Sequence, residues 1–128
     1  MEHTPAGGIR WVDAGNDHFT GSVLFGPLSS AVDRNLNALG VLFEPGARTD
    51  WHTHPEGQVL YIVSGAGKVQ TDDGETVRVS AGDVVYSPAG EKHWHGATET
   101  SFLMHLSLTT GGATEWFPDK VSDRDYRA

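Results

Sequence analysis

The amino-acid sequence predicts an all-β fold, a small barrel of short strands, and three observations lead to this prediction. Sixteen glycines and six prolines are spread along all 128 residues, so they divide the chain into short segments rather than mark a linker. The segments between them are rich in β-branched and aromatic residues, and apolar positions alternate with polar ones. Turn signals recur at roughly 8–12-residue spacing, which is typical of β-sandwiches and barrels.

The individual strands follow from the alternation and from the turn residues that separate them. The third expected strand ends at Ser64-Gly65, and Asp72-Asp73-Gly74 is a strong hairpin signal between the fourth and the fifth. Only the tail suggests a helix, a short one that Ser122 could cap, with Asp125 three positions later. The expected strands cover residues 19–25, 39–43, 58–63, 68–70, 76–79, 83–86 and 102–108.

Length and charge limit what the chain can be. A chain of 128 residues fits one compact domain, residues 1–128, although only 38% of it is hydrophobic. It has 17 acidic and 9 basic residues, a net charge of −8, so nucleic acid and anionic membrane surfaces are poor partners. The absence of cysteine excludes disulfides, zinc–thiolate sites and thiol nucleophiles.

The N-terminus carries no visible targeting signal. Residues 1–5 show no basic region followed by an apolar core, and no apolar run approaches the roughly 20 residues that cross a bilayer. We therefore expect a soluble, cytoplasmic protein. A processed precursor that had lost its signal would leave the same sequence.

Histidines form the most informative pattern. Five of the seven fall between residues 52 and 105. On a strand, His52 and His54 project from the same face roughly 6–7 Å apart, close enough to converge on one metal ion. A turn at residues 55–57 could return the amide oxygen of Gln58 to the same point. His93 would be the third imidazole, arriving from a distant strand.

The spacing of these residues matches a known pattern. Two motifs follow one another: Gly46, five residues, His52-Thr53-His54, three residues, Gln58, six residues, Gly65; then Gly82, five residues, Pro88-Ala89-Gly90, two residues, His93. With these motifs at 46–65 and 82–97, the sequence resembles single-domain bacterial cupins over nearly its whole length. The resemblance implies a cupin-type double-stranded β-helix, or jelly-roll barrel.

Two positions depart from the family pattern. Gln58 stands where a glutamate ligand is usual, and Ala97 stands where an asparagine is expected. The amide of Gln58 still offers a carbonyl oxygen, so the site keeps four ligands. Three neutral imidazoles and a neutral amide leave the full +2 charge on the metal, which sharpens it as a Lewis acid. The set also differs from the two-histidine, one-carboxylate triad of non-haem iron oxygenases.

A narrower resemblance concerns residues 43–49, 51–55 and 90–96, which are similar to the manganese-dependent cupin hydroxynitrile lyases. It implies one divalent metal on the four ligands, with manganese expected and iron, nickel or zinc as alternatives. It also implies cleavage of aromatic cyanohydrins to aldehyde and hydrogen cyanide. Small cupins commonly pair, so a homo-oligomer, a dimer or tetramer, is expected.

In such a lyase, a histidine would transfer the proton. His95 has the strand parity of His93 and should face the cavity, whereas the pattern around His105 allows either face and only the resemblance turns it inward. Either imidazole could take the hydroxyl proton and return a proton to cyanide. The apolar wall for the aromatic ring is expected to comprise Leu39, Val41 and Leu60.

Other hypotheses about the function remain open. The same ligands could serve a metal-dependent dioxygenase or isomerase, or the barrel could bind a small molecule without catalysis. The remaining conspicuous side chains have ordinary roles: we expect surface positions for His3 and His18, packing or subunit-interface positions for Trp51, Trp94, Trp116 and Phe117, and solvated turn positions for Asp50 and Glu56.

Overall fold

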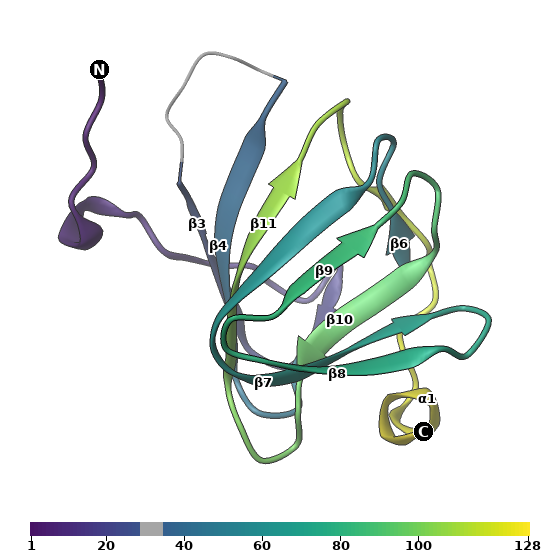
Figure 1. Ribbon diagram of the computed structural model, residues 1–128. Helices are drawn as coiled ribbons and strands as arrows, with labels where there is room; N and C mark the ends of the chain where they lie inside the picture. Colours follow the sequence, from purple (N-terminus) through teal and green to yellow (C-terminus); the bar gives the residue numbers. More distant parts are fainter. Residues whose placement is uncertain (29–34) are drawn as a thin grey trace.

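Two β-sheets curl around one interior, as Figure 1 shows, and the all-β prediction is confirmed. The computed structural model describes residues 1–28 and 35–128. Sheet A has the strand order β1 (Val12–Asp13), β3 (Val23–Pro27), β4 (Asn37–Phe43), β11 (Leu103–Thr109), β7 (Gln58–Thr71) and β9 (Val84–Ser87). Sheet B contains β2 (Phe19–Thr20), β5 (Arg48–Thr49), β10 (His93–Ala97), the second half of β7 and β8 (Thr76–Ser80), while β6 (His52–Thr53) joins β10 to β12 (Glu115–Trp116).

The long strand β7 belongs to both sheets. Its first half pairs with β11 and β9, and its second half pairs with β10 and β8. The prediction that the strand ends at Ser64-Gly65 is therefore wrong. Gly65 marks a bend instead: its φ is +83°, and a Cβ there would lie 1.9 Å from the carbonyl oxygen of Phe102. Only glycine combines this conformation with so close an approach. The predicted hairpin at residues 72–74 is confirmed by the pairing of Gln70 with Thr76.

The paired inward residues of β4 and β11 change from apolar to polar along the barrel. Leu103 lies opposite Phe43, and both are fully buried; at the other end of the same strands Thr109 lies opposite Asn37. The apolar core therefore fills one end of the barrel, and a cavity lined by both polar and apolar side chains lies at the other. The core comprises Val23, Val41, Phe43, Ala47, Leu60, Ile62, Val69, Val79, Ala97 and Leu103.

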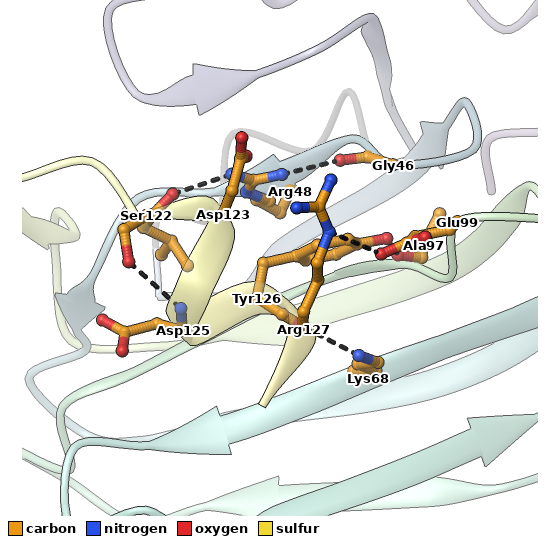
Figure 2. A network of polar contacts seen from close by, with 11 residues as sticks. Gly46, Arg48, Lys68, Ala97, Glu99, Ser122, Asp123, Asp125, Tyr126 and Arg127 are labelled. Atoms are coloured by element: carbon orange, nitrogen blue, oxygen red, sulfur yellow. Dashed lines mark hydrogen bonds and ion pairs between the residues drawn. The ribbon is translucent and has the colours of Figure 1, made fainter.

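The chain ends in a short helix, α1 (Asp123–Arg127), capped by Ser122 as predicted: the Ser122 hydroxyl accepts from the backbone N–H of residue 125 at 3.1 Å. Figure 2 shows how the helix docks. Tyr126 is buried, donates to the carbonyl oxygen of Ala97 at 2.6 Å, and has the guanidinium of Arg48 4.4 Å above its ring. Lys68 donates to the Tyr126 carbonyl at 2.7 Å.

A short 3₁₀ turn (Ala6–Gly8) precedes β1. No helix among the described residues is long and apolar enough to cross a membrane.

Candidate metal centre and cavity

Strand pairing brings the predicted ligands together at the polar end of the barrel. His52 on β6 lies opposite His93 on β10, with ring centroids 4.4 Å apart. His54 follows β6 immediately, and its ring lies 4.9 Å from that of His52 and 5.6 Å from that of His93. The turn that follows needs a positive φ of +90° at Gly57, and it returns the chain so that Gln58 opens β7. All four predicted ligands are buried.

The amide of Gln58 hydrogen-bonds through its nitrogen and presents its oxygen to the histidines. Its Nε2 donates to the hydroxyl of Ser107 on β11 at 2.8 Å. Its carbonyl oxygen Oε1 therefore faces the histidines and lies 3.1 Å from Nε2 of His93. Hydrogen bonding to the amide nitrogen thus presents the oxygen, the atom that can bind a metal, to the centre of the cluster.

Two backbone carbonyls fix which ring nitrogens carry hydrogen. Nδ1 of His52 lies 2.8 Å from the carbonyl oxygen of Asp50, and Nδ1 of His93 lies 3.0 Å from that of Glu91. A carbonyl oxygen only accepts, so both Nδ1 atoms donate. Burial lowers the pKa of both imidazoles below the usual value, so they are neutral and each carries its lone pair on Nε2.

The donor set therefore fits a divalent cation. The lone pair of His93 Nε2 and the carbonyl oxygen of Gln58 face each other across 3.1 Å, and neither is a donor. A cation between these two acceptor atoms would stabilise the arrangement. Imidazole nitrogen and amide oxygen suit manganese, iron, nickel and zinc.

His54 adds a further available nitrogen. Its Nδ1 lies 3.3 Å from the hydroxyl of Thr114, while its buried Nε2 has no hydrogen-bond partner in the described part of the chain. Burial, followed by the neighbouring His93, lowers the pKa of His54 to about 4, so this ring is neutral near pH 7. A neutral imidazole with a free nitrogen is what metal binding requires.

The compact nitrogen cluster also includes His95. Within the described residues, ligand atoms of His52, His93 and His95 lie within 4.8 Å of one another, and His54 is outside this trio. His95, predicted as a base, is therefore near enough to act as a ligand as well. The division of roles between His54 and His95 stays a prediction.

His95 and His105 form a buried pair. Nε2 of His105 lies 3.2 Å from Nδ1 of His95, while Nε2 of His95 and Nδ1 of His105 have no partner among the described residues. The backbone N–H of His95 donates to the hydroxyl of Thr49. Burial lowers the pKa of His105 to about 4, and burial together with His105 lowers the pKa of His95 well below its usual value. Both imidazoles are neutral near pH 7 and one can donate to the other.

These histidines open onto a cavity of about 450 Å³, its open mouth included. Leu39 and Val41 are among its lining residues and Leu60 is not; their role as an apolar wall for a substrate ring stays a prediction. Apart from its histidines, no described lining residue is ionisable. The lining comprises Phe19, Asn37, Leu39, Val41, Thr49, His52, His54, Gln58, His95, His105, Ser107, Thr109, Thr114 and Trp116.

Several of these lining residues were missed at the sequence level. Ser107 and Thr109 share the strand parity of His105, so alternation alone could have found them once His105 was turned inward. Trp116 was expected to pack or to lie at a subunit interface, but it lines the cavity. It reaches that position by long-range pairing of β12 with β6, for which the local sequence carries no signal.

Two further expectations concern charged and aromatic residues near the site. Asp50 was expected to be solvated, but it is 2% exposed and its carboxylate pairs with Lys120 at 3.2 Å. Glu56 is exposed as expected and accepts from Thr110. His18 is exposed as expected but also stacks on Trp116.

Comparison with known proteins adds independent information. The family model described as the Cupin domain matches residues 41–109. An "(R)-mandelonitrile lyase" of Granulicella tundricola is 46% identical over 115 residues, which cover 87% of each chain. An "Acireductone dioxygenase" of Granulibacter bethesdensis is 35% identical over 78 residues, 56% of this chain and 44% of that protein. A cupin-like protein from Thermotoga maritima superposes with a TM-score of 0.85 at 37% identity, covering 90% of both chains.

Proposed function

This chain belongs to the cupin family, and on that premise we propose that it is a metal-dependent hydroxynitrile lyase that cleaves or forms aromatic cyanohydrins. The observation that carries the proposal is the neutral donor set: Gln58 Oε1 and the Nε2 lone pair of His93 face each other without a carboxylate among the described cavity residues. The similarity to a mandelonitrile lyase supports the same activity.

The metal would be held by His52, His54, Gln58 and His93, and we propose manganese, with iron, nickel or zinc as alternatives. When bound by four neutral ligands, such an ion supplies Lewis acidity toward a hydroxyl oxygen with its +2 charge undiminished. Asp50 and Glu91 orient His52 and His93 through their backbone carbonyls. The protein thus prepares the ligand nitrogens in advance.

The buried pair would move the proton. If Nδ1–H of His95 donates to Nε2 of His105, the lone pair on Nε2 of His95 is free to take the hydroxyl proton of a cyanohydrin. The carbon–carbon bond then breaks: the electron pair of the O–H bond forms the aldehyde carbonyl, and the pair of the C–C bond leaves with cyanide. The imidazolium returns its proton to cyanide, which gives hydrogen cyanide and restores neutral His95.

The cavity wall suits a neutral aromatic substrate. Leu39, Val41 and the rings of Phe19 and Trp116 line it. These side chains can bury a phenyl group, and the described lining residues include no acidic or cationic side chain apart from the histidines, which agrees with an uncharged ligand. Burial against this wall would hold the reacting carbon near the histidines.

The proposal is tested with mandelonitrile. Protein stripped with a chelator and then reconstituted separately with manganese, iron, nickel or zinc is assayed for benzaldehyde release above the buffer rate. We expect cleavage with at least one metal and none in the stripped protein. Protein that holds a full equivalent of each metal and releases no benzaldehyde would refute the lyase proposal.

A second candidate is a metal-dependent dioxygenase, favoured by the similarity to acireductone dioxygenase over 78 residues. The same histidines would hold the metal. The two candidates differ in their need for oxygen, because lyase cleavage is not an oxidation. An activity that stops when oxygen is removed would favour the dioxygenase.

A further inference from the structure

We propose that Lys120 is a positioning residue that fixes the wall segment, residues 114–117, over the cavity, and that through this segment it limits the size of the aromatic group accepted. The inference rests on the proposed lyase function for its substrate. It concerns a side chain that does not line the cavity and is far from the ligands in the sequence.

The wall segment touches both the cavity and the candidate ligands. Trp116 lines the cavity, and its ring centroid lies 4.8 Å from that of His52 and 5.9 Å from that of Phe19. The hydroxyl of Thr114 lies 3.3 Å from Nδ1 of His54. The position of this segment therefore decides how much room remains beside the metal ligands.

The segment has little hydrogen bonding of its own to hold it. Within the described residues, β12 has two residues and pairs with β6 alone, placing Trp116 opposite His52. One further backbone bond joins Phe117 N–H to the carbonyl of Trp51 at 3.0 Å. So short a pairing is marginal by itself, which makes any additional anchor important.

Lys120 supplies that anchor. Its ammonium nitrogen lies 2.6 Å from the backbone carbonyl oxygen of Asn16, 3.2 Å from that of Asp17, 3.3 Å from that of Phe19 and 3.2 Å from a carboxylate oxygen of Asp50, so its three N–H groups are shared among four acceptors. It thereby joins three parts of the chain: the loop 16–19, the residue two positions before β6, and the segment that follows the wall. Each part contains or adjoins a residue of the cavity lining: Phe19 in the first, Thr49 beside Asp50, and Trp116 before the third.

The loop and the wall also contact each other directly. The ring of His18 stacks on that of Trp116, with centroids 4.3 Å apart and planes 6° from parallel. Phe19, the next residue, lines the cavity beside Trp116. By holding the carbonyls of residues 16, 17 and 19, Lys120 fixes the segment whose His18 ring stacks on the Trp116 indole.

Charge adds a second effect that the experiment must separate. The carboxylate of Asp50 is 2% exposed, and within the described residues its other oxygen has no hydrogen-bond partner. A buried carboxylate without its cation is strongly unfavourable. Loss of Lys120 therefore both frees the wall segment and leaves a buried charge unpaired. Replacing Asp50 by Asn removes the charge but does not restore the anchor.

Three variants test the inference: Lys120→Met, the double variant Asp50→Asn/Lys120→Met, and the control Arg127→Met. Arg127 lies near the same terminus in an exposed ion pair with Glu99 at 3.1 Å, so its loss should change little. The readouts are amide hydrogen exchange over residues 14–20 and 110–121, and steady-state kinetics with mandelonitrile and with the bulkier 2-naphthaldehyde cyanohydrin, all on metal-loaded protein.

We expect faster exchange over both segments in Lys120→Met and in the double variant, and parental exchange in Arg127→Met. The KM for mandelonitrile should rise roughly 5- to 30-fold while kcat changes little, since the lost contacts hold the ring rather than the reacting atoms. The ratio of kcat/KM for the naphthyl over the phenyl substrate should rise in both variants. General destabilisation would lower kcat/KM for both substrates equally and leave the ratio of the two values unchanged.

The inference would be overturned if the double variant had the same exchange rates, KM and substrate ratio as the parent protein, because Lys120 would then only neutralise Asp50. The double variant carries no unpaired charge, so it decides the question even if Lys120→Met alone does not fold. A parent protein that cleaves neither substrate would refute the lyase proposal. Hydrogen exchange would still decide whether Lys120 anchors the wall.

Discussion

Acid should destabilise the metal-free protein, and His105 allows the size of the effect to be worked out. Its pKa is about 4 in the folded protein because it is buried, against 6.5 for a solvated histidine. Between these two values the unfolded chain binds more protons than the folded one, so the free energy of unfolding falls as the pH falls. The contribution of His105 to stability is fully present above pH 6.5 and is lost as the pH drops to about 4.

The magnitude follows from the difference of roughly 2.5 pH units between the two pKa values. At about 1.4 kcal/mol per unit, His105 alone should cost roughly 3 kcal/mol by pH 4. That is a large part of the roughly 5–15 kcal/mol that stabilises a typical domain. His52, His54, His93 and His95 are also buried with lowered pKa values, so their contributions have the same sign.

The assay is urea unfolding in the presence of a chelator at several pH values between 7 and 4.5, for the parent and for His105→Gln. Glutamine does not titrate, so the variant should lose less stability than the parent over this range, with a difference approaching roughly 3 kcal/mol toward pH 4. If the free energies of unfolding of the parent and of His105→Gln fall in parallel as the pH is lowered, the reasoning is refuted. A parallel fall would show that His105 does not resist protonation in the fold.

Three further predictions concern the metal and the proton. Replacing His52 or His93 by Ala should abolish stoichiometric divalent metal, which plasma-emission analysis measures; a full equivalent in both variants would refute their assignment as ligands. Gln58→Glu should keep the metal but lower turnover, because the carboxylate offsets part of the +2 charge; unchanged turnover would show that the neutral amide is incidental. Replacing His95 or His105 by Ala should leave metal content near the parent level, with activity falling by about 10²–10⁴-fold for the true base. Metal loss in the His95 variant would make it a ligand, and full activity in both variants would exclude the proton transfer proposed for the pair.

Much of the fold could be predicted from local alternation. The strands β9 and β11 follow it closely, because their residues face the interior and the opposite side in turn. The continuous strand β7 could not be predicted in this way. Gly65 has the same local sequence signal whether it ends a strand or lets it bend close to Phe102, and only tertiary packing decides between the two.

In the candidate site too, some residues could be predicted from the local sequence and others depend on long-range contacts. His52, His54 and Gln58 lie within seven residues, so strand geometry and one tight turn already place them together. The wall beside them depends on contacts that span the chain: Trp116 meets His52 through β12, and the buried Asp50 pairs with Lys120, 70 positions later. No local pattern specifies such contacts.

Cleavage without oxygen is the most direct consequence of the proposed chemistry. The decisive measurement is anaerobic incubation of metal-loaded protein with mandelonitrile, with benzaldehyde and cyanide quantified together. The lyase proposal predicts equal amounts of the two products, formed at the rate seen in air. A reaction that stops without oxygen, or aldehyde formed without an equivalent of cyanide, would contradict it.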